Sequence, residues 1–187
     1  IAFKTKLLKA VKTKDTQILM ESLSPDIRFT FDSVSGKKEF KKHFELNSQP
    51  EKSEIWTILD STFKLGFYLN PEGQFVSPYM YEKFPQELDV FTHSVVIGTN
   101  VNVRTEAHID AKVLDRLSFH IVQNVPSDPN DGSAEDNKGN CNWQKVCLAD
   151  GREGFICDKY LRSPIDYRIF FEKQKQKWFI TTMVAGD

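Results

Sequence analysis

Three aromatic residues in the second half of the chain are the strongest candidates for contacts with a ligand: Trp143, Phe155 and Tyr160. Flat amphipathic side chains bind peptides and sugars at a low cost in conformational entropy. The competing interpretation is that Trp143 and Phe155 fill the interior of the fold. Arg104 lies in the same stretch, and we expect it to hydrogen-bond a turn rather than a ligand. This chemistry is recognition, not catalysis.

All the thiols of the chain lie near these aromatic residues, at Cys141, Cys147 and Cys157. Because their number is odd, at most one pair can form within the chain. A hairpin that turns at Asp150-Gly151 sets Cys157 opposite Gln144 and on a different face from Cys147, which disfavours that bridge. Cys141 reaches Cys157 only if the chain bends before Trp143. Zinc needs about four ligands, usually with a close Cys or His pair, which is missing. We therefore expect free or buried thiols, with one bridge as the alternative.

The segment 126–142 is rich in Asp, Asn, Gly, Ser and Pro, which predicts a mobile loop. Its acidic residues are Asp128, Asp131, Glu135 and Asp136. The calcium-loop spacing Asp-x-Asp-x-Asp-Gly with a terminal Glu is absent. We predict no metal and no cofactor.

A second set of residues could line a small-molecule or enzymatic pocket in the rest of the chain: Trp56, Asp60, Tyr79, Tyr81, Asp89 and His93. An Asp or His base paired with a Tyr donor can transfer protons if the groups lie within hydrogen-bond reach. The alternative is that Trp56 belongs to the core and the others lie on the surface. Gly-x-Ser-x-Gly, a phosphate-binding glycine loop and His-Glu-x-x-His are all absent. We expect a protein without enzymatic activity.

Several short apolar segments surround the candidate aromatic residues. Val101 and Val103 alternate with polar neighbours, which is the period of a half-buried strand. Further segments lie at 113–117, 119–122, 143–148 and 155–156. Asp150-Gly151 between two of them is a strong hairpin signal. Five short strands in about sixty residues predict a small barrel or sandwich.

In order, these segments resemble the bacterial type of Src-homology-3 domain. The matching pieces are Val-Asn-Val-Arg at 101–104, Lys-Val-Leu at 112–114, Trp-x-x-Val at 143–146, Asp-Gly-x-x-Gly-Phe-Ile at 150–156, and Tyr-Leu at 160–161. The family has Trp where this chain has Phe155, and its connection at 126–142 is shorter. The resemblance implies a β-barrel that recognises a peptidoglycan peptide or a protein segment of the bacterial cell envelope.

The chain on both sides of this stretch predicts a separate domain. Helical stripes occur at 4–11, 16–23, 38–46 and 55–63, Asp15 or Thr16 is a candidate cap, and Gly66 is a candidate stop. A strand is expected at 27–31, after a break at 24–26. The tail 167–184 is an apolar hairpin, which is marginal alone and needs a partner sheet. We predict that it completes the first domain.

Helices first and a returning hairpin last resemble the nuclear-transport-factor-2-like, cystatin-like group. The resemblance implies an α+β fold in which helices pack on a curved antiparallel sheet and leave a cone-shaped pocket. The predicted domains are therefore 1–94 with 164–187, and an inserted Src-homology-3-like β-barrel at 95–163.

Composition narrows the class of partner. Charged residues make up 27% of the chain and the net charge is −1, so no long-range field recruits nucleic acid or an acidic membrane. The sequence has no run of about eighteen apolar residues, so it predicts no transmembrane segment. The chain starts at Ile1, which is compatible with a removed secretion or lipoprotein leader. We expect a periplasmic or extracellular binding protein, with attachment by a lipid anchor on that leader as an alternative.

Overall fold

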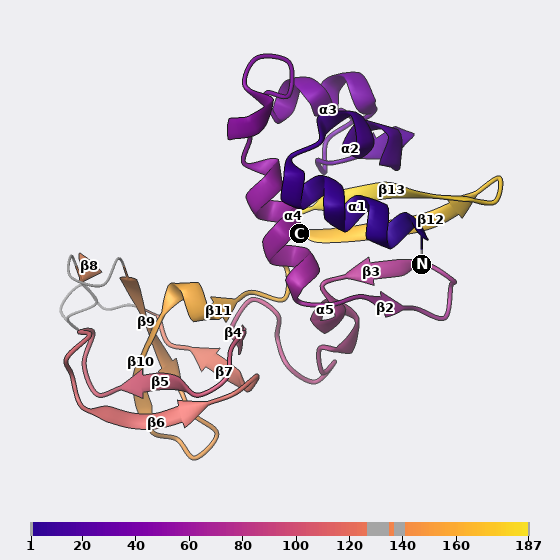
Figure 1. Cartoon of the computed structure of the whole chain (residues 1–187). Coiled ribbons are helices and arrows are strands. Elements are labelled where there is room, and N and C mark those ends of the chain that lie inside the picture. The colour runs from indigo at the N-terminus through magenta and orange to yellow at the C-terminus, as the bar shows by residue number, and fades with distance from the viewer. Residues whose placement is uncertain (1, 127–134, 137–140, 187) are drawn as a thin grey trace. The chain divides into compact units, whose positions relative to one another are not determined.

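The computed structural model describes residues 2–126, 135–136 and 141–186, which form a mixed α+β protein with two main sheets (Figure 1). The chain divides into two compact units. Unit 1 consists of Ile1–Phe84 and Ile165–Asp187, and unit 2 is Pro85–Pro164. The sequence placed the first border at 94/95, ten residues later than the border at 84/85.

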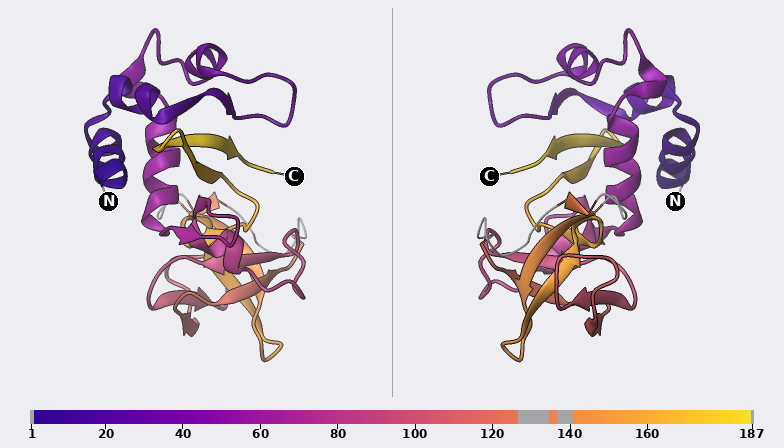
Figure 2. Two further views of the ribbon diagram at one scale, coloured as in Figure 1. Left: turned by 90° about the vertical axis from the view of Figure 1, so that its right-hand side faces the viewer. Right: turned by 90° about the vertical axis from the view of Figure 1, so that its left-hand side faces the viewer.

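Helices precede and interrupt the sheet of unit 1. They are α1 (Ala2–Thr13), α2 (Thr16–Ser22), α3 (Lys37–His43), the short 3₁₀ helix η1 (Pro50–Lys52), α4 (Ile55–Lys64) and α5 (Tyr79–Lys83). The predicted cap is confirmed, because the Asp15 carboxylate accepts a hydrogen bond of 3.0 Å from the amide of Ile18. Gly66 follows α4 with φ +82°, the left-handed conformation expected at a helix end. Figure 2 shows α1 and α4 on the same side of the tail strands.

The sheet of unit 1 has the strand order β1-β13-β12-β3-β2. Its strands are β1 (Leu23–Arg28), β2 (Tyr68–Leu69), β3 (Phe75–Ser77), β12 (Arg168–Gln174) and β13 (Lys177–Val184). The tail hairpin β12–β13 therefore lies between strands of the N-terminal segment. Lys175 and Gln176 form its two-residue turn, and both have positive φ, as a type I′ turn requires.

Two features of this sheet correct the sequence analysis. The expected antiparallel sheet is mixed, because β1 runs parallel to β13. Residues 24–26, predicted to be a break, belong to β1, which ends at Arg28. Pro25 is tolerated there because β1 is an edge strand. An edge strand pairs with a neighbour on one side only, so a residue without an amide proton can face the open side without the loss of a hydrogen bond.

The core of unit 1 joins helices, N-terminal strand and tail. Phe29 and Trp56 share one buried cluster with Ile169 and Ile180 of the tail. Ile169 and Ile180 have no exposed surface, and burial of such a side chain stabilises a fold by about 1.5–3 kcal/mol. The tail hairpin is thus bound to unit 1 by both backbone pairing and apolar packing.

Unit 2 is a sheet of short antiparallel strands in the order β11-β4-β7-β9-β10-β5-β6, with β8 paired to β9. The strands are β4 (His93–Val96), β5 (Val101–Arg104), β6 (Val113–Leu117), β7 (Ile121–Asn124), β8 (Glu135–Asp136), β9 (Cys141–Cys147), β10 (Glu153–Cys157) and β11 (Leu161–Arg162), and η2 (Asp158–Tyr160) is a 3₁₀ turn. Val103, Val146 and Ile156 form the centre of its core.

The hairpin β9–β10 turns at the predicted place but in a different register. Leu148 and Arg152 are joined by a backbone hydrogen bond, so the loop has three residues and Gly151 has φ +83°. A two-residue turn was expected. The extra loop residue shifts the pairing by one position, so that Cys157 lies opposite Trp143 rather than Gln144. Because side chains alternate along a strand, this shift places the Cys157 side chain on the same face of the hairpin as that of Cys141.

Most of the predicted loop 126–142 lies outside the described residues. Within it, the backbone of Glu135–Asp136 pairs with β9. Asp128 and Asp131 are not described. In the described part of the chain, no helix is both long and apolar enough to cross a bilayer.

Candidate functional site

A groove on unit 2 brings together two of the three predicted contact residues. We call it the disulfide groove. It has a volume of about 180 Å³ and is lined by Thr99, Asn100, Val101, Asn102, Arg104, Ile109, Cys141, Trp143, Cys157, Lys159 and Tyr160. These residues come from β5 and its two flanking loops, from the first half of β9, and from the end of β10 with η2. The hairpin register positions the groove, because it places Trp143 beside Cys157.

Trp143 is buried, with 5% of its surface exposed. It packs in a small cluster with Cys141, Phe155 and Cys157, separate from the main core of unit 2. Its Nε1–H group has no hydrogen-bond partner among the described residues. A buried donor without a partner costs about 1–3 kcal/mol, and such groups deserve an explanation.

Among the described residues, two cations and no carboxylate line the disulfide groove. Arg104 Nη1 donates to the carbonyl of Ala111 at 2.7 Å, which confirms the expected bond to a turn. That bond uses one of the guanidinium donors and fixes the side chain in place. Lys159 Nζ lies 5.3 Å from the ring centre of Tyr160. The groove thus offers cationic and aromatic groups suited to a ligand with acceptor oxygens or a negative charge.

The three predicted residues occupy different environments. Tyr160 is 41% exposed and lines the groove, and Trp143 lines it from a buried position. Phe155 is buried and lies in the cluster with Trp143, outside the set of lining residues. Phe155 therefore supports Trp143 rather than the surface of the groove.

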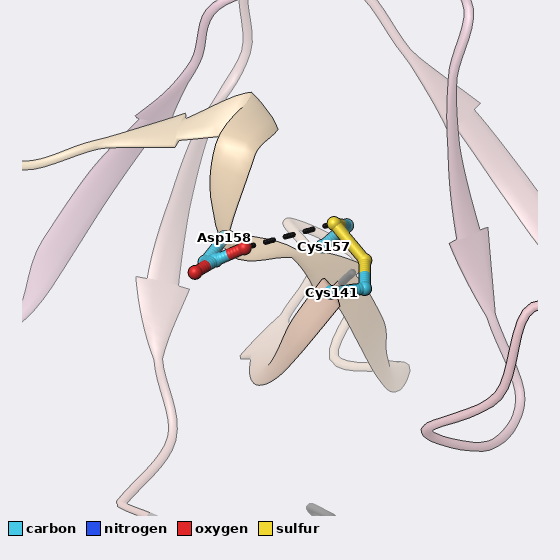
Figure 3. Close-up of side chains that lie close together, drawn as sticks. All are labelled: Cys141, Cys157 and Asp158. Carbon is cyan, nitrogen blue, oxygen red and sulfur yellow. Dashed lines mark hydrogen bonds between the residues drawn. A yellow bond between two sulfur atoms is a disulfide. The ribbon is translucent and has the colours of Figure 1, made fainter. Parts of the chain in front are cut away.

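Cys141 and Cys157 form a disulfide whose Cα atoms are 5.3 Å apart, so the expectation of free thiols is wrong for this pair (Figure 3). Cys147 is the free cysteine. Asp158 lies beside the bridge, with its Oδ1 atom 3.7 Å from Cys157 Sγ. The carboxylate accepts hydrogen bonds from the side-chain amide of Asn142 at 3.0 Å and from the backbone amide of Lys159 at 2.8 Å.

The donor atoms of Cys141, Cys157 and Asp158 lie within 4.8 Å of one another, a spacing that could hold a metal ion. Thiolates are the sulfur ligands of metals, and sulfurs bonded to each other are not thiolates. The oxidised pair is therefore a covalent link between the start of β9 and the end of β10.

An exposed ion cluster fixes the turn end of the β9–β10 hairpin. Arg152 donates to Asp150 at 2.7 Å and also to Asp115 of β6. The pKa of Asp115 lies below its ordinary value because the backbone amide of Arg116 and the guanidinium of Arg152 donate to it. The pKa of Asp150 is lowered by the backbone amide and then the guanidinium of Arg152. This cluster connects β6 to the hairpin and does not line the groove.

The residues predicted for an enzymatic pocket do not converge. Trp56 is in the core and donates to the carbonyl of Pro50. Asp60 is exposed on α4 and pairs with Lys64 at 2.6 Å. Tyr79 is exposed on α5, and the ring of Tyr81 packs edge-on against Phe170.

The remaining pair, Asp89 and His93, belongs to unit 2, where the carbonyl of Asp89 lies 3.0 Å from His93 Nδ1. The set therefore provides no shared base and donor.

Unit 1 instead has an apolar pocket lined by residues that the sequence did not single out. We call it the α1 pocket. Its volume is about 260 Å³, and its lining residues are Phe3, Lys4, Leu7, Leu8, Phe67, Phe75, Phe171 and Trp178. They come from α1, the residue after Gly66, and strands β3, β12 and β13. No local sequence pattern connects positions so far apart.

Comparison with known proteins leaves the family open. No protein-family model and no curated protein matches the chain. One solved structure, a designed nuclear-transport-factor-2-like protein, aligns over 97% of this chain and 91% of its own, with 12% identity and a TM-score of 0.32. A similarity this low carries no argument about the fold. The description of the chain as a mixed α+β protein with two sheets rests on its own strands and helices.

Proposed function

We propose that this chain is a non-catalytic binding protein of the bacterial cell envelope, and that the disulfide groove of unit 2 recognises a peptide carrying a carboxylate. Unit 2 is then a Src-homology-3-like barrel inserted in a cystatin-like host. The preferred ligand is the stem peptide of peptidoglycan, with a protein segment as the other source of the same chemistry. The observation that carries the proposal is the buried Nε1–H of Trp143, which has no partner among the described residues, on a side chain that lines a groove whose described lining includes two cations and no acid.

The order of the sequence motifs supports the barrel. The Val-Asn-Val-Arg piece is β5, Lys-Val-Leu leads into β6, Trp-x-x-Val lies in β9, and the Asp-Gly piece is the turn into β10. The strands among them belong to one sheet, and the Asp-Gly piece connects two of these strands. Arg104, from the first motif, closes the loop that supplies Ile109 to the groove.

The ligand chemistry follows from the available donors. A peptide carboxylate can accept from Lys159 and from the free donors of Arg104, and charge-assisted hydrogen bonds of this kind are about twice as strong as neutral ones. Trp143 Nε1 is buried in the free chain, and on binding a peptide carbonyl would become its acceptor. Tyr160 provides an exposed flat surface for the backbone or an apolar side chain of the peptide. No carboxylate of the described lining opposes a negatively charged ligand.

The disulfide supports an oxidising compartment, because such bonds persist in the periplasm and outside cells and are rare in the cytosol. A periplasmic or extracellular location brings the groove into the same compartment as the cell wall.

Sedimentation with purified, protein-free peptidoglycan tests the proposal. Wild-type chain should be retained, and Tyr160→Ala should lower the affinity roughly tenfold, since truncation of an aromatic contact typically costs about 1–3 kcal/mol. Lys159→Glu should weaken binding further at low salt.

Phe119→Ala is the matched control, because Phe119 is an exposed aromatic residue of unit 2 that does not line the groove. Its affinity should equal that of the wild type. Equal binding by wild type and Tyr160→Ala would contradict the site. Retention by a protein partner but not by peptidoglycan would assign the groove to a protein segment.

A further inference from the structure

The α1 pocket has the composition of a ligand site rather than of a surface depression. Five aromatic rings, two leucines and one lysine line it. Leu7 and Phe171 are buried, whereas Phe3, Phe75 and Trp178 are only partly buried. Small-molecule sites are typically concave and apolar with a few polar groups that fix orientation.

The rings hold one another in place, so the pocket is preformed. Phe3 and Phe67 lie 6.2 Å and 5.7 Å from Phe171, and Phe75 lies 5.1 Å from Trp178, measured between ring centres. Helix α1 packs against α2 and α4. Phe3, Lys4, Leu7 and Leu8 of this helix line the pocket together with residues of β3, β12 and β13.

Lys4 gives the pocket its polarity. It is the charged residue of the lining, and its Nζ lies 4.2 Å from the ring centre of Phe67. Within the described chain, Lys4 has no ion pair, in contrast to Lys6 on the same helix, which pairs with Glu21 at 2.9 Å. In the part of the chain that the structure describes, no carboxylate lines the pocket. A negative group on a ligand would thus meet an uncompensated cation beside an apolar cavity.

We infer that the α1 pocket binds a small amphipathic carboxylate, with its apolar chain among the aromatic rings and its carboxylate beside Lys4. The size agrees with a short chain. At about 30 Å³ for each water-sized group, 260 Å³ holds roughly nine such groups. This site is independent of the disulfide groove and of any peptide ligand.

Calorimetric titration of the whole chain with three probes that share an eight-carbon chain tests the charge preference. Octanoate should bind more tightly than 1-octanol, and octyltrimethylammonium should bind least. Lys4→Glu should weaken octanoate roughly fivefold to tenfold at low salt and leave 1-octanol unchanged, because an exposed charge contact is modest and reversal doubles its effect.

Lys9→Glu is the matched control. It makes the same charge change on the same helix at an exposed position outside the pocket, and octanoate affinity should stay within about twofold of wild type. An equal loss in Lys9→Glu and Lys4→Glu would show a general charge effect and overturn the assigned carboxylate position.

Nuclear Overhauser contacts locate the bound chain. Octanoate methyl protons should show contacts with the rings of Phe75 and Trp178. Contacts to Trp143 alone, no octanoate binding at millimolar concentration, or tighter binding of octyltrimethylammonium would each overturn the inference. None of these results changes the expected retention on peptidoglycan, so the two proposals fail separately.

Discussion

The disulfide should provide much of the stability of the groove. The bridge joins Cys141 to Cys157 with a sequence separation of 16, and it encloses the whole β9–β10 hairpin. The chain-entropy relation for a loop of this length gives about 3 kcal/mol of stabilisation. Replacing both cysteines by serine should therefore destabilise unit 2 by about that amount, which corresponds to a change of roughly a hundredfold in the equilibrium of opening.

Hydrogen exchange resolved by segment measures this effect where it occurs. Amides of β9 and β10 should exchange roughly a hundredfold faster in the double variant, while those of β12 and β13 in unit 1 should be unchanged. Cys147→Ser is the control, since Cys147 is a free thiol in the same strand. A change below about threefold in β9 and β10, or equal acceleration in unit 1, would refute the reasoning.

Three further predictions concern unit 2. Acid below about pH 4 should lower the stability of unit 2, because the fold lowers the pKa of Asp115 and the stabilising contribution of its carboxylate is lost as the pH falls through that folded pKa. The melting temperature of Asp115→Asn should therefore depend less on pH in that range. Gly154→Ala should lower the free energy of unfolding by about 1–3 kcal/mol, because an added Cβ would lie 2.7 Å from Val103 Cγ1 and 2.9 Å from the Arg104 carbonyl oxygen. The measurement is the urea midpoint, which should fall, and an unchanged midpoint would contradict this packing. Trp143→Phe should change the free energy of unfolding by less than about 1 kcal/mol, because the lost packing is offset by removal of a donor that has no partner among the described residues. The same variant should weaken peptide binding about tenfold, and an unchanged affinity would refute a role for Nε1.

The local signals in the sequence predicted local structure well. The Asp15 cap, the left-handed Gly66 and the turn near Asp150-Gly151 all depend on the chemistry of a few adjacent residues, and each is present. The mixed α+β class follows from the same signals. Strand register is different, because it depends on loop length, and a three-residue loop differs from a two-residue loop by one pairing position.

That single position explains the error over the cysteines. With Cys157 opposite Trp143, the side chains of Cys141 and Cys157 share a face, and the bridge becomes possible. The groove depends on the same register. Sequence patterns identified Trp143 and Tyr160 by residue type but could not show that they line one groove together with a disulfide.

The α1 pocket was not predictable from local patterns. Its residues come from positions 3–8, 67, 75, 171 and 178, and each fits the apolar face of its own helix or strand. A core residue and a pocket residue look alike in sequence. Lys4, which gives the site its charge, resembles the other exposed lysines of α1 until its neighbours are known.

The indole N–H resonance of Trp143 provides the most direct test of peptide recognition by the disulfide groove. In a nitrogen-15 spectrum titrated with a purified peptidoglycan stem peptide, this signal should move downfield and saturate as Nε1–H gains an acceptor, while the indole signals of Trp56 and Trp178 stay in place. A Trp143 signal that does not move at saturating peptide, or movement confined to Trp178, would contradict the proposed function.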